Sequence, residues 1–349
     1  MEKLIAILKE FQIPDHNYEF ETISNGFIND TFLVSYKGES LYILQRINTN
    51  VFPNIHSLIH NLDLVLPVLK DVNYQEIVLV RSNNGESFIH NSKNEVWRLM
   101  TFVKNSIVHN TTKDPEVAFE AGRVVGLFHH LTQKVDVEKL KETLPDFHSI
   151  SFRYDQFKQA LLTAEKSKVE QAKKPIDFVR NNIAELLGIK MDSLPIRTCH
   201  NDTKLNNILF SRSNKSLCLI DLDTIMKGTY LFDFGDAVRT IVNSAKEDEQ
   251  DLSKINFSLE MFEAFINGLS LHGKDLSKKE KELLPLGVVL MPFLHGIRAL
   301  TDFLENNKYY KVSYENQNLD RCLSLFTFAQ LALNNQSAMG NVITNKLKS

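Results

Sequence analysis

Alternating apolar and polar residues dominate the first hundred positions of the chain and predict a β-rich region. Turn-forming residues separate these alternating stretches. The predicted strands are residues 18–23, 31–36, 41–47, 77–80 and 96–100. Helical spacing of apolar residues predicts a helix over 1–14 and another over 54–69. We therefore expect a mainly β unit at the start of the chain.

The pattern changes at Asp114-Pro115-Glu116, which is a typical helix start, and apolar residues then recur at helical spacing. Further predicted helices lie within 152–186, 277–304 and 319–333. The prediction is an α+β chain of two lobes. The N-terminal lobe covers 1–103, and the mainly helical C-terminal lobe covers 104–349.

One stretch interrupts the helical half and carries chemically suggestive residues. It has the form His200-x-Asp202-x-x-x-x-Asn207. Two short apolar runs follow, at 208–210 and 217–220, on either side of a polar turn. This pattern predicts a β-hairpin. A hairpin brings its ends together, so the residue after the second run, Asp221, is expected beside Asn207.

This arrangement suits phosphoryl transfer from ATP. Asp202 would orient the attacking hydroxyl and accept its proton, while Asn207 and Asp221 would hold Mg²⁺ on the phosphates, with Asp223 as the second candidate ligand. The alternative is that Asp202 caps a turn and Asp221 ends a strand in water. The whole string is much rarer than a lone His-x-Asp, which favours the catalytic interpretation.

A second motif, Phe232-Asp233-Phe234-Gly235, contains the tripeptide that carries the metal-binding Asp of protein kinases. It lies too late in the chain, because no hairpin strand leads into it from residues 200–207, the predicted catalytic loop. We expect Asp233 to brace the catalytic loop or to cap a helix beginning near Gly235.

Nucleotide-binding residues are expected in the first lobe. The loop with Asn25 and Gly26 could approach phosphates with its backbone N–H groups, although one Asn-Gly is usually just a hairpin turn. Arg46 occupies the strand where a kinase carries its phosphate-binding Lys; the alternative is a surface Arg on an edge strand. The only acid of the 54–69 helix is Asp63, so the usual Lys–Glu pair must be absent or replaced.

Three further residues outside the first strands of the N-terminal lobe are expected to contact the nucleotide. The segment Thr101-Phe102-Val103 leaves the sheet where a hinge would bind adenine through the backbone, so Thr101 and Val103 are candidates. Lys204, inside the catalytic stretch, is a third candidate.

Composition sets limits on partners and location. The chain has 349 residues, 43% apolar and 24% charged, with a net charge of −3, which gives no electrostatic case for nucleic acid or an anionic membrane. Three cysteines without metal-ligand spacing indicate reduced thiols in a cytoplasmic protein. The start of the chain lacks a signal-peptide core, and no run of about twenty apolar residues exists. The acidic run 246–251 reads as solvated, and we expect a monomer or weak homo-oligomer.

These motifs together resemble the aminoglycoside phosphotransferase and choline kinase superfamily, a branch of the protein-kinase-like fold. A narrower set of blocks is similar to N-acetylhexosamine 1-kinases. The blocks are residues 25–32, 44–48, 200–207, 220–224, 310–311 and 318–321.

The resemblance implies a nucleotide-binding first lobe, Asp202 as base, Asn207 and Asp221 as metal ligands, and Arg46 near the nucleotide. It also implies a sugar site in the C-terminal lobe. The candidates there are polar or amphipathic residues that supply both hydrogen-bond donors and acceptors: Arg298, Asp302, Tyr310 and Arg321. The alternative for each is a salt bridge on a helix surface.

Three functions therefore compete. The leading one is a MgATP-dependent kinase acting on the anomeric hydroxyl of an N-acetylhexosamine. The second keeps the fold but takes an aminoglycoside, choline or homoserine type of acceptor; residues 298–321 carry four basic and four acidic residues, which does not suit a polycation. The third is a nucleotide-binding regulator without catalysis, which the presence of Asp202, Asn207 and Asp221 disfavours.

Overall fold

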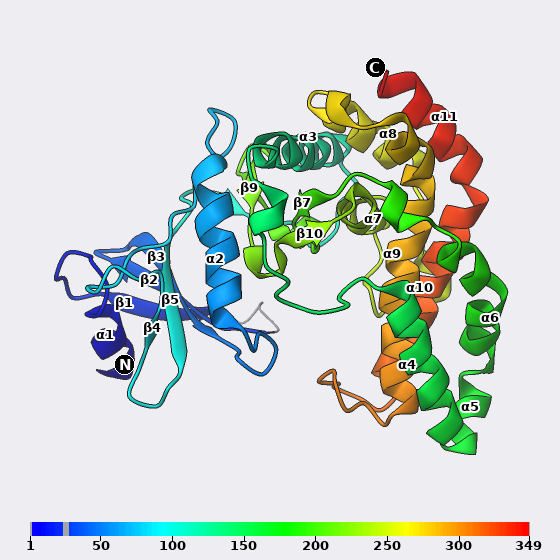
Figure 1. Cartoon of the computed structure of the whole chain (residues 1–349), viewed down its shortest axis with the longest axis horizontal. Helices are drawn as coiled ribbons and strands as arrows, with labels where there is room; N and C mark the ends of the chain where they lie inside the picture. The colour runs from blue at the N-terminus through cyan, green and yellow to red at the C-terminus, as the bar shows by residue number, and fades with distance from the viewer. Residues whose placement is uncertain (1, 24–27, 349) are drawn as a thin grey trace.

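The computed structural model of the protein describes residues 2–23 and 28–348 and has two lobes (Figure 1). The N-terminal lobe is built on a five-stranded antiparallel sheet with the strand order β1-β2-β3-β5-β4. Its strands are β1 (Glu19–Ile23), β2 (Asp30–Tyr36), β3 (Glu39–Ile47), β4 (Ile89–His90) and β5 (Val96–Thr101). Its helices are α1 (Glu2–Leu8) and α2 (Ile55–Val65), with a short 3-10 turn at Leu66–Val68.

The two faces of this sheet belong to different cores, because successive side chains of a strand point to opposite faces. Leu44 and Trp97 pack with α1 in a small outer core. Ile47 and Val96, on the inner face, join α2 and the large core that continues into the C-terminal lobe. These four residues therefore fix the face on which each of their neighbours in β3 and β5 lies, because side chains alternate along a strand.

The C-terminal lobe is mainly helical. Its helices are α3 (Pro115–Thr132), α4 (Ile150–Thr163), α5 (Lys166–Gln171), α6 (Lys173–Leu187), α7 (Tyr230–Ile241), α8 (Leu259–Leu269), α9 (Lys278–Leu304), α10 (Gln317–Asn334) and α11 (Gln336–Lys346). Short 3-10 helices lie at Val137–Lys139, Met191–Ser193, Leu205–Asn207, Leu222–Thr224, Leu252–Lys254 and Gly273–Asp275. The predicted helix start is confirmed, because Asp114 accepts a hydrogen bond from the Glu116 N–H and caps α3.

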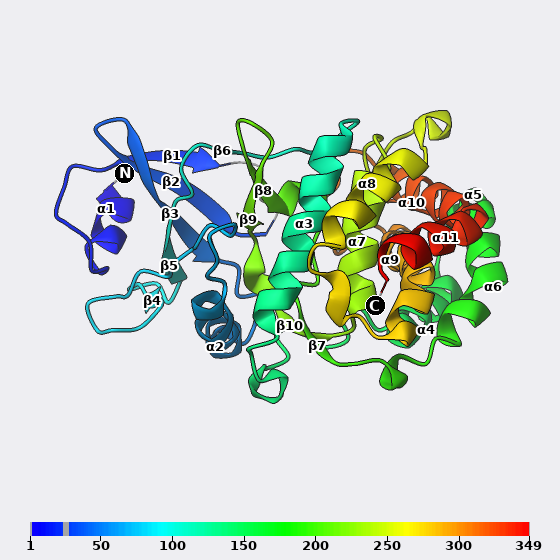
Figure 2. The ribbon, with the colours of Figure 1, turned by 90° about the horizontal axis from the view of Figure 1, so that it is seen from above.

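Short strands position the catalytic region between the lobes. One small sheet has the order β6-β8-β9, with β6 (Ser106–Ile107), β8 (Ile208–Ser211) and β9 (Ser216–Leu219); the other pairs β7 (Arg197–Cys199) with β10 (Met226–Gly228). The β8–β9 hairpin lies between the N-terminal sheet and α3 (Figure 2). The predicted hairpin is therefore confirmed.

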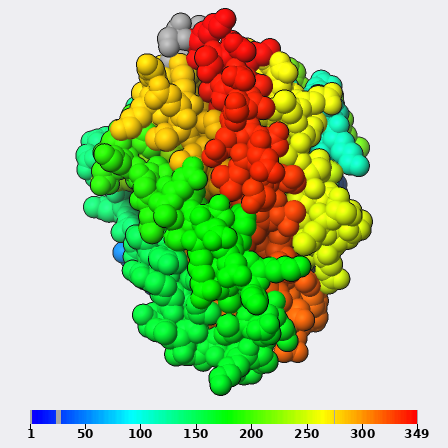
Figure 3. Space-filling view, turned by 90° about the vertical axis from the view of Figure 1, so that its right-hand side faces the viewer, coloured from blue at the N-terminus to red at the C-terminus, as the bar shows by residue number. Residues whose placement is uncertain are grey.

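Helix α9 is the central helix of the C-terminal lobe. It begins with a capping box formed by Ser277 and Glu280. By length and composition it could cross a membrane, but 78% of its most apolar window is buried within the protein. Helices α4–α6 and α10–α11 cover much of it at the end of the lobe remote from the sheet (Figure 3). It is thus a core helix of the folded chain.

Helices α7 and α9 touch through their backbones. A Cβ atom added at Gly235 of α7 would lie 2.1 Å from the carbonyl oxygen of Gly287 in α9, which is far inside van der Waals contact. Only glycine at position 235 permits so close an approach. This contact fixes the spacing of two helices that carry polar residues toward the catalytic loop.

Three sequence-based boundaries differ from the structure. The first helix ends at Leu8 and not near residue 14, because the chain then bonds to the 81–83 segment. Residues 77–80 form one bridge, Leu79 to Met100, and not a strand. The stretch 152–186 is divided among α4, α5 and α6, since the backbone leaves the helical region at Ala164 (ψ 150°).

Candidate active site

The catalytic loop leads from β7 through the Leu205–Asn207 turn into the β8–β9 hairpin. The Ile220 N–H donates a hydrogen bond to the Asn207 carbonyl oxygen at 2.9 Å, immediately after β9. Residue 221 therefore returns beside residue 207, as the two apolar runs predict. The backbone of Asp221 is left-handed (φ 60°), an uncommon conformation for a residue with a side chain.

Asp202 is oriented by two neighbours. The Asn207 Nδ2 donates to the Asp202 Oδ2 and to its carbonyl oxygen, each at 2.8 Å, and the Lys204 Nζ lies 2.8 Å from the same Oδ2. Burial alone would lower the pKa of Lys204, but Asp202 and Asp221 raise it, so the ammonium stays charged. The structure thus gathers the predicted residues Asp202, Lys204 and Asn207 in one network.

Asp233 braces this loop from behind. Its buried carboxylate accepts hydrogen bonds from the His200 N–H at 2.8 Å and the Asn201 N–H at 2.6 Å, and it lies 2.8 Å from the His129 Nε2. The predicted bracing role is confirmed. The predicted cap is wrong, because α7 begins at Tyr230 after Thr229, and Asp233 already lies within its first turn.

Asp221 and Asp223 have different surroundings. Asp223 is 2% exposed, pairs with Arg98 and accepts a hydrogen bond from the Asn29 Nδ2 at 2.8 Å, so both of its oxygens have partners. The side chain of Asp221 is exposed to solvent but closely surrounded by protein. This partial desolvation, and then the nearby Asp223 and Asp202, raise the pKa of its carboxyl to about 6. The negative charge of Asp221 is therefore poorly compensated by the protein.

The donor set fits a divalent cation such as Mg²⁺. Asp221 supplies a carboxylate with little compensating charge, and the Asn207 Nδ2 bonds to Asp202, which leaves Oδ1 as a hard oxygen ligand. Within residues 2–23 and 28–348, no three His, Cys, Asp or Glu side chains form a complete metal cage. An ion here would take its other ligands from phosphates and water, as protein-bound Mg²⁺ commonly does.

The arginines Arg46 and Arg98 lie on opposite faces of the N-terminal sheet. Arg46 lies on the outer face, 41% exposed, with Asp30 and Glu95 as ion partners. Gln45 and Arg98 form a cross-strand pair on the inner face, where the Arg98 Nε donates to the Gln45 Oε1 at 3.0 Å. The structure therefore does not bring Arg46 toward Asp202. Arg98 was not predicted, although its alternation with Trp97 is a usable signal.

The structure describes two of the four other residues predicted to bind the nucleotide. Asn25 and Gly26 lie outside the described residues. The Thr101 N–H donates to the Val78 carbonyl oxygen at 3.0 Å, and the buried Val103 accepts from the Ser106 hydroxyl at 2.7 Å. Both residues lie where the chain leaves β5, between the lobes, and their contact with adenine stays a prediction.

The predicted sugar-site residues lie in one region of the C-terminal lobe, and they differ in how many of their polar groups already have partners within the protein. Asp302 is 3% exposed and accepts hydrogen bonds from the Tyr309 N–H (2.7 Å), the Tyr310 N–H (2.9 Å) and the Asn318 Nδ2 (2.9 Å). Both oxygens of its carboxylate are engaged by these contacts, which hold the 305–316 loop. The guanidinium of Arg321 lies 4.7 Å from the centre of the Tyr310 ring.

A buried polar network beside Arg321 was not predicted. The Arg239 Nε lies 2.8 Å from the Asp236 Oδ1, and its Nη1 lies 2.8 Å from the Glu247 Oε2. Glu247 also pairs with Arg321 and is 31% exposed, so the prediction that the acidic run is solvated holds only in part at this residue. Burial would raise the pKa of Glu247, but Arg321 and Arg239 hold it well below its usual range.

Two histidines link this network to the catalytic loop. The His295 Nε2 lies 3.3 Å from the Asp236 Oδ1. The His148 Nε2 lies 3.0 Å from the carbonyl oxygen of Asn201, the residue before Asp202. Burial lowers the pKa of His148 to about 4, so its imidazole is neutral near pH 7 and the Nε2–H donates to that carbonyl.

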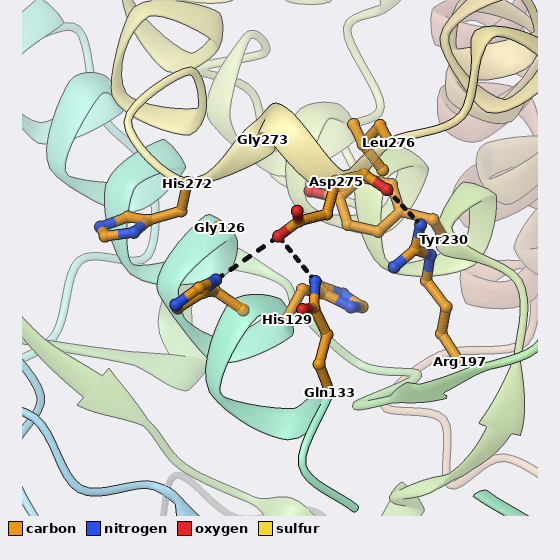
Figure 4. A pocket seen from close by; sticks show the side chains of 10 residues that line it. Gly126, His129, Gln133, Arg197, Tyr230, His272, Gly273, Asp275 and Leu276 are labelled. Atoms are coloured by element: carbon orange, nitrogen blue, oxygen red, sulfur yellow. Dashed lines mark hydrogen bonds and ion pairs between the residues drawn. The ribbon is translucent and has the colours of Figure 1, made fainter. Parts of the chain in front are cut away.

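A small cavity lies behind the catalytic loop, between α3 and the Gly273–Asp275 turn (Figure 4). Its volume is about 10 Å³, room for about one water molecule. The Gln133 Nε2 donates to the Asp275 Oδ2 at 2.7 Å at its edge, and His129, which contacts Asp233, also lines it. The cavity lies beside the residues that brace the catalytic loop, and it is too small for a substrate.

Comparisons with known proteins agree with this geometry. Residues 19–262 match the model of a family described as the phosphotransferase enzyme family. A microcompartment-associated aminopropanol kinase superimposes with a TM-score of 0.65 at 17% identity, covering 97% of this chain and 98% of that one. Spectinomycin phosphotransferase, solved with ADP and spectinomycin, gives 0.60 at 12% identity, with 95% and 98% covered. Choline kinase from Cryptosporidium parvum Iowa II gives 0.58 at 12% identity, with 99% of each covered. The predicted kinase-like two-lobed α+β fold is confirmed.

Proposed function

This chain belongs to the phosphotransferase enzyme family, and on that premise we propose that it transfers the γ-phosphate of MgATP to the anomeric hydroxyl of an N-acetylhexosamine. The observation that carries the proposal is the network around Asp202. Its carboxylate is aimed by Asn207 and Lys204 and lies close enough to Asp221 to affect its ionisation.

Each residue of this network has a proposed role. Asp202 accepts a hydrogen bond from the acceptor hydroxyl and takes its proton as the bond to phosphorus forms. Lys204 places a positive charge beside the transferring phosphoryl group. Asn207 and Asp221 hold Mg²⁺, which supplies charge neutralisation on the phosphate oxygens when bound. Asp223, whose oxygens are both engaged, supports the site through Arg98 and is not a proposed ligand.

ATP is proposed to bind between the sheet and the catalytic loop. The backbone of Thr101 and Val103 would hold adenine, and the loop with Asn25 and Gly26 would approach the phosphates. The sheet cation that faces this space is Arg98, whereas Arg46 points outward and supports the sheet through Asp30 and Glu95. Arg46 is therefore proposed to affect the nucleotide site only indirectly.

The acceptor proposal rests on charge as well as on the sequence blocks. Asp236 and Glu247 are both paired with arginines, and both oxygens of the Asp302 carboxylate accept hydrogen bonds. A polycationic acceptor needs carboxylates that are free to pair with it, and these three are already engaged with arginines or hydrogen-bond donors. Arg298, Tyr310 and Arg321 instead offer hydrogen-bond donors and an aromatic face, which suit a sugar.

An ATP-consumption assay with paired acceptors tests this function. The free N-acetylhexosamine should react and its methyl glycoside should not, because the glycoside lacks the anomeric hydroxyl, and NMR of the product should place phosphate on the anomeric oxygen. The Asp202→Asn protein is the matched control for contaminating kinases. Reaction of both sugars would move the transfer to another hydroxyl. Reaction with choline, an aminoglycoside or homoserine alone would overturn the sugar proposal and keep the kinase.

The remaining sequence-based statements stay predictions. They are a cytoplasmic location, the state of a monomer or weak homo-oligomer, and the lack of a nucleic-acid or membrane partner.

A further inference from the structure

Two arginines converge on one aromatic residue at the edge of the proposed acceptor site. The guanidinium of Arg298, on α9, lies 5.4 Å from the centre of the Phe147 ring. The Arg153 Nη2, on α4, donates to the Phe147 carbonyl oxygen at 3.3 Å. Helices α4 and α9 pack against each other, so the two side chains come from neighbouring helices of the same lobe.

Neither guanidinium has a carboxylate partner within the described part of the chain. The polar contacts of Arg153 are the Gln156 Oε1 at 2.8 Å and the Phe147 carbonyl, and its Nε is buried without a partner. Arg298 is half-buried and makes no ion pair or hydrogen bond to the described residues. The other buried or half-buried arginines of this lobe each pair with a carboxylate: Arg123, Arg197, Arg239 and Arg321.

An unpaired, partly buried cation is costly, so this pair calls for an explanation. Burial and then the charge of Arg298 lower the pKa of Arg153 to about 10, which agrees with two positive charges held close together. Asp146 is exposed and pairs with neither arginine. A bound anion would satisfy both guanidinium groups, including the unpartnered Arg153 Nε.

The location links this pair to the reaction. Phe147 precedes His148, whose Nε2–H donates to the Asn201 carbonyl beside Asp202. Arg298 also lies close enough to influence the charge of His148. The arginine pair is thus connected to the loop that carries Asp202 through Phe147 and His148.

We propose that Arg153 and Arg298 form an anion-binding subsite that takes a carboxylate or phosphate group of the acceptor. Planar guanidinium groups bind such groups through paired hydrogen bonds. An acidic derivative of the N-acetylhexosamine would then be preferred over the neutral sugar, which still reacts. The link to the acceptor rests on the proposed function, whereas anion binding itself requires no catalytic step.

Isothermal titration calorimetry on the full chain tests the subsite directly. Malonate and inorganic phosphate are titrated with MgADP in excess, so that the nucleotide site is filled. Saturable binding is expected in the wild type, with a loss of about tenfold or more in Arg153→Gln and Arg298→Gln. Arg180→Gln, which alters an exposed pair with Asp177, is the control and should bind like the wild type.

Two results would overturn the subsite: no saturable binding to the wild type, or unchanged affinity in both glutamine variants. Arg298→Lys keeps the charge and loses the planar fork, so it should bind with intermediate affinity. This variant decides the matter if a glutamine variant fails to fold, which thermal melting reveals.

Kinetics distinguish an acceptor group from a free anion. Two sugars are compared that differ only in a carboxylate replacing a hydroxymethyl group. The acidic sugar should have a KM about tenfold lower in the wild type, and Arg298→Gln should remove that advantage. Equal KM values, with turnover that responds to added malonate, would overturn the acceptor assignment in favour of a free anion. If no sugar reacts at all, the proposed function fails while the binding isotherms still decide the subsite.

Discussion

Arg98 on β5 and Asp223, just after the β8–β9 hairpin, form a buried ion pair that joins the two lobes, and each side chain is 2% exposed. Gln45 supports the arginine and Asn29 supports the carboxylate. Asp63, the acid of α2, instead pairs with Arg81 near the surface. The sheet is thus fixed over the catalytic loop by a contact between β5 and the hairpin end, and not by a pair between β3 and α2.

Arg98→Met should lower the free energy of unfolding by about 3–5 kcal/mol, because it leaves the Asp223 carboxylate buried without its counter-charge. Urea unfolding measures the change. Arg81→Met removes a 48% exposed arginine from its pair with Asp63 and is the matched control, with an expected loss of no more than about 1 kcal/mol. Equal losses in the two variants would contradict a special role for the buried pair.

Asp202→Asn should reduce turnover by about 10²–10⁴-fold, because the amide cannot take the proton of the acceptor hydroxyl. ATP affinity should change little, since the backbone and Lys204 remain. Steady-state kinetics and nucleotide titration measure the two quantities separately. Near-normal turnover would show that another group is the base.

Asp221→Ala should abolish Mg²⁺-dependent nucleotide affinity while the fold persists. Asp233→Ala should instead destabilise the protein, by about 1–3 kcal/mol for each of the His200 and Asn201 N–H groups left unpaired. MgATP titration and thermal melting on both variants check this division. If only the Asp233 variant lost Mg²⁺-dependent affinity, with its stability intact, the two assignments would have to be exchanged.

His148 should make stability depend on pH. Its pKa is about 4 in the folded protein against 6.5 ordinarily, so only the unfolded chain binds the proton between these values. The free energy of unfolding should therefore fall as pH drops from 6.5 toward 4, by up to about 1.4 kcal/mol per pH unit from this group. His148→Gln should remove that part of the slope while keeping a donor toward Asn201.

Urea unfolding at several pH values measures the slope in wild type and variant. His60, which is exposed and also lies against a backbone carbonyl, is the matched control, and His60→Gln should keep the wild-type slope. His295, Asp236 and Arg298 remain in the variant, so the difference between the two slopes measures His148 together with its coupling to these three groups. Identical slopes for wild type and His148→Gln would refute the assignment.

The sequence predicts best what is local. The hairpin follows from two apolar runs and a turn, and from it the proximity of Asn207 and Asp221 follows as geometry. The bracing role of Asp233 could be inferred because the position of Asp221 leaves no metal role for the later motif. These inferences need only a few residues of backbone between the positions concerned.

Contacts that depend on strand orientation and distant pairing were missed. Gln45 and Arg46 are adjacent, and only the packing of Leu44 and Trp97 against α1 decides which of them points inward. Arg98 and Asp223 are far apart in the chain, so no local pattern pairs them. Glu247 looks solvated in its acidic run, yet two arginines from α7 and α10 reach it.

The backbone contact between Gly235 and Gly287 sets the separation between helices α7 and α9. Asp233 lies on α7 near this contact and holds the loop that carries Asp202. Helix α9 carries His295 and Arg298. In the proposed acceptor site, the span between the reacting hydroxyl at Asp202 and the far end of the acceptor at Arg298 would therefore depend on how closely these two helices approach. A methyl group added at position 235 would push α7 and α9 apart and destabilise this lobe, and in the proposed site it would also lengthen that span.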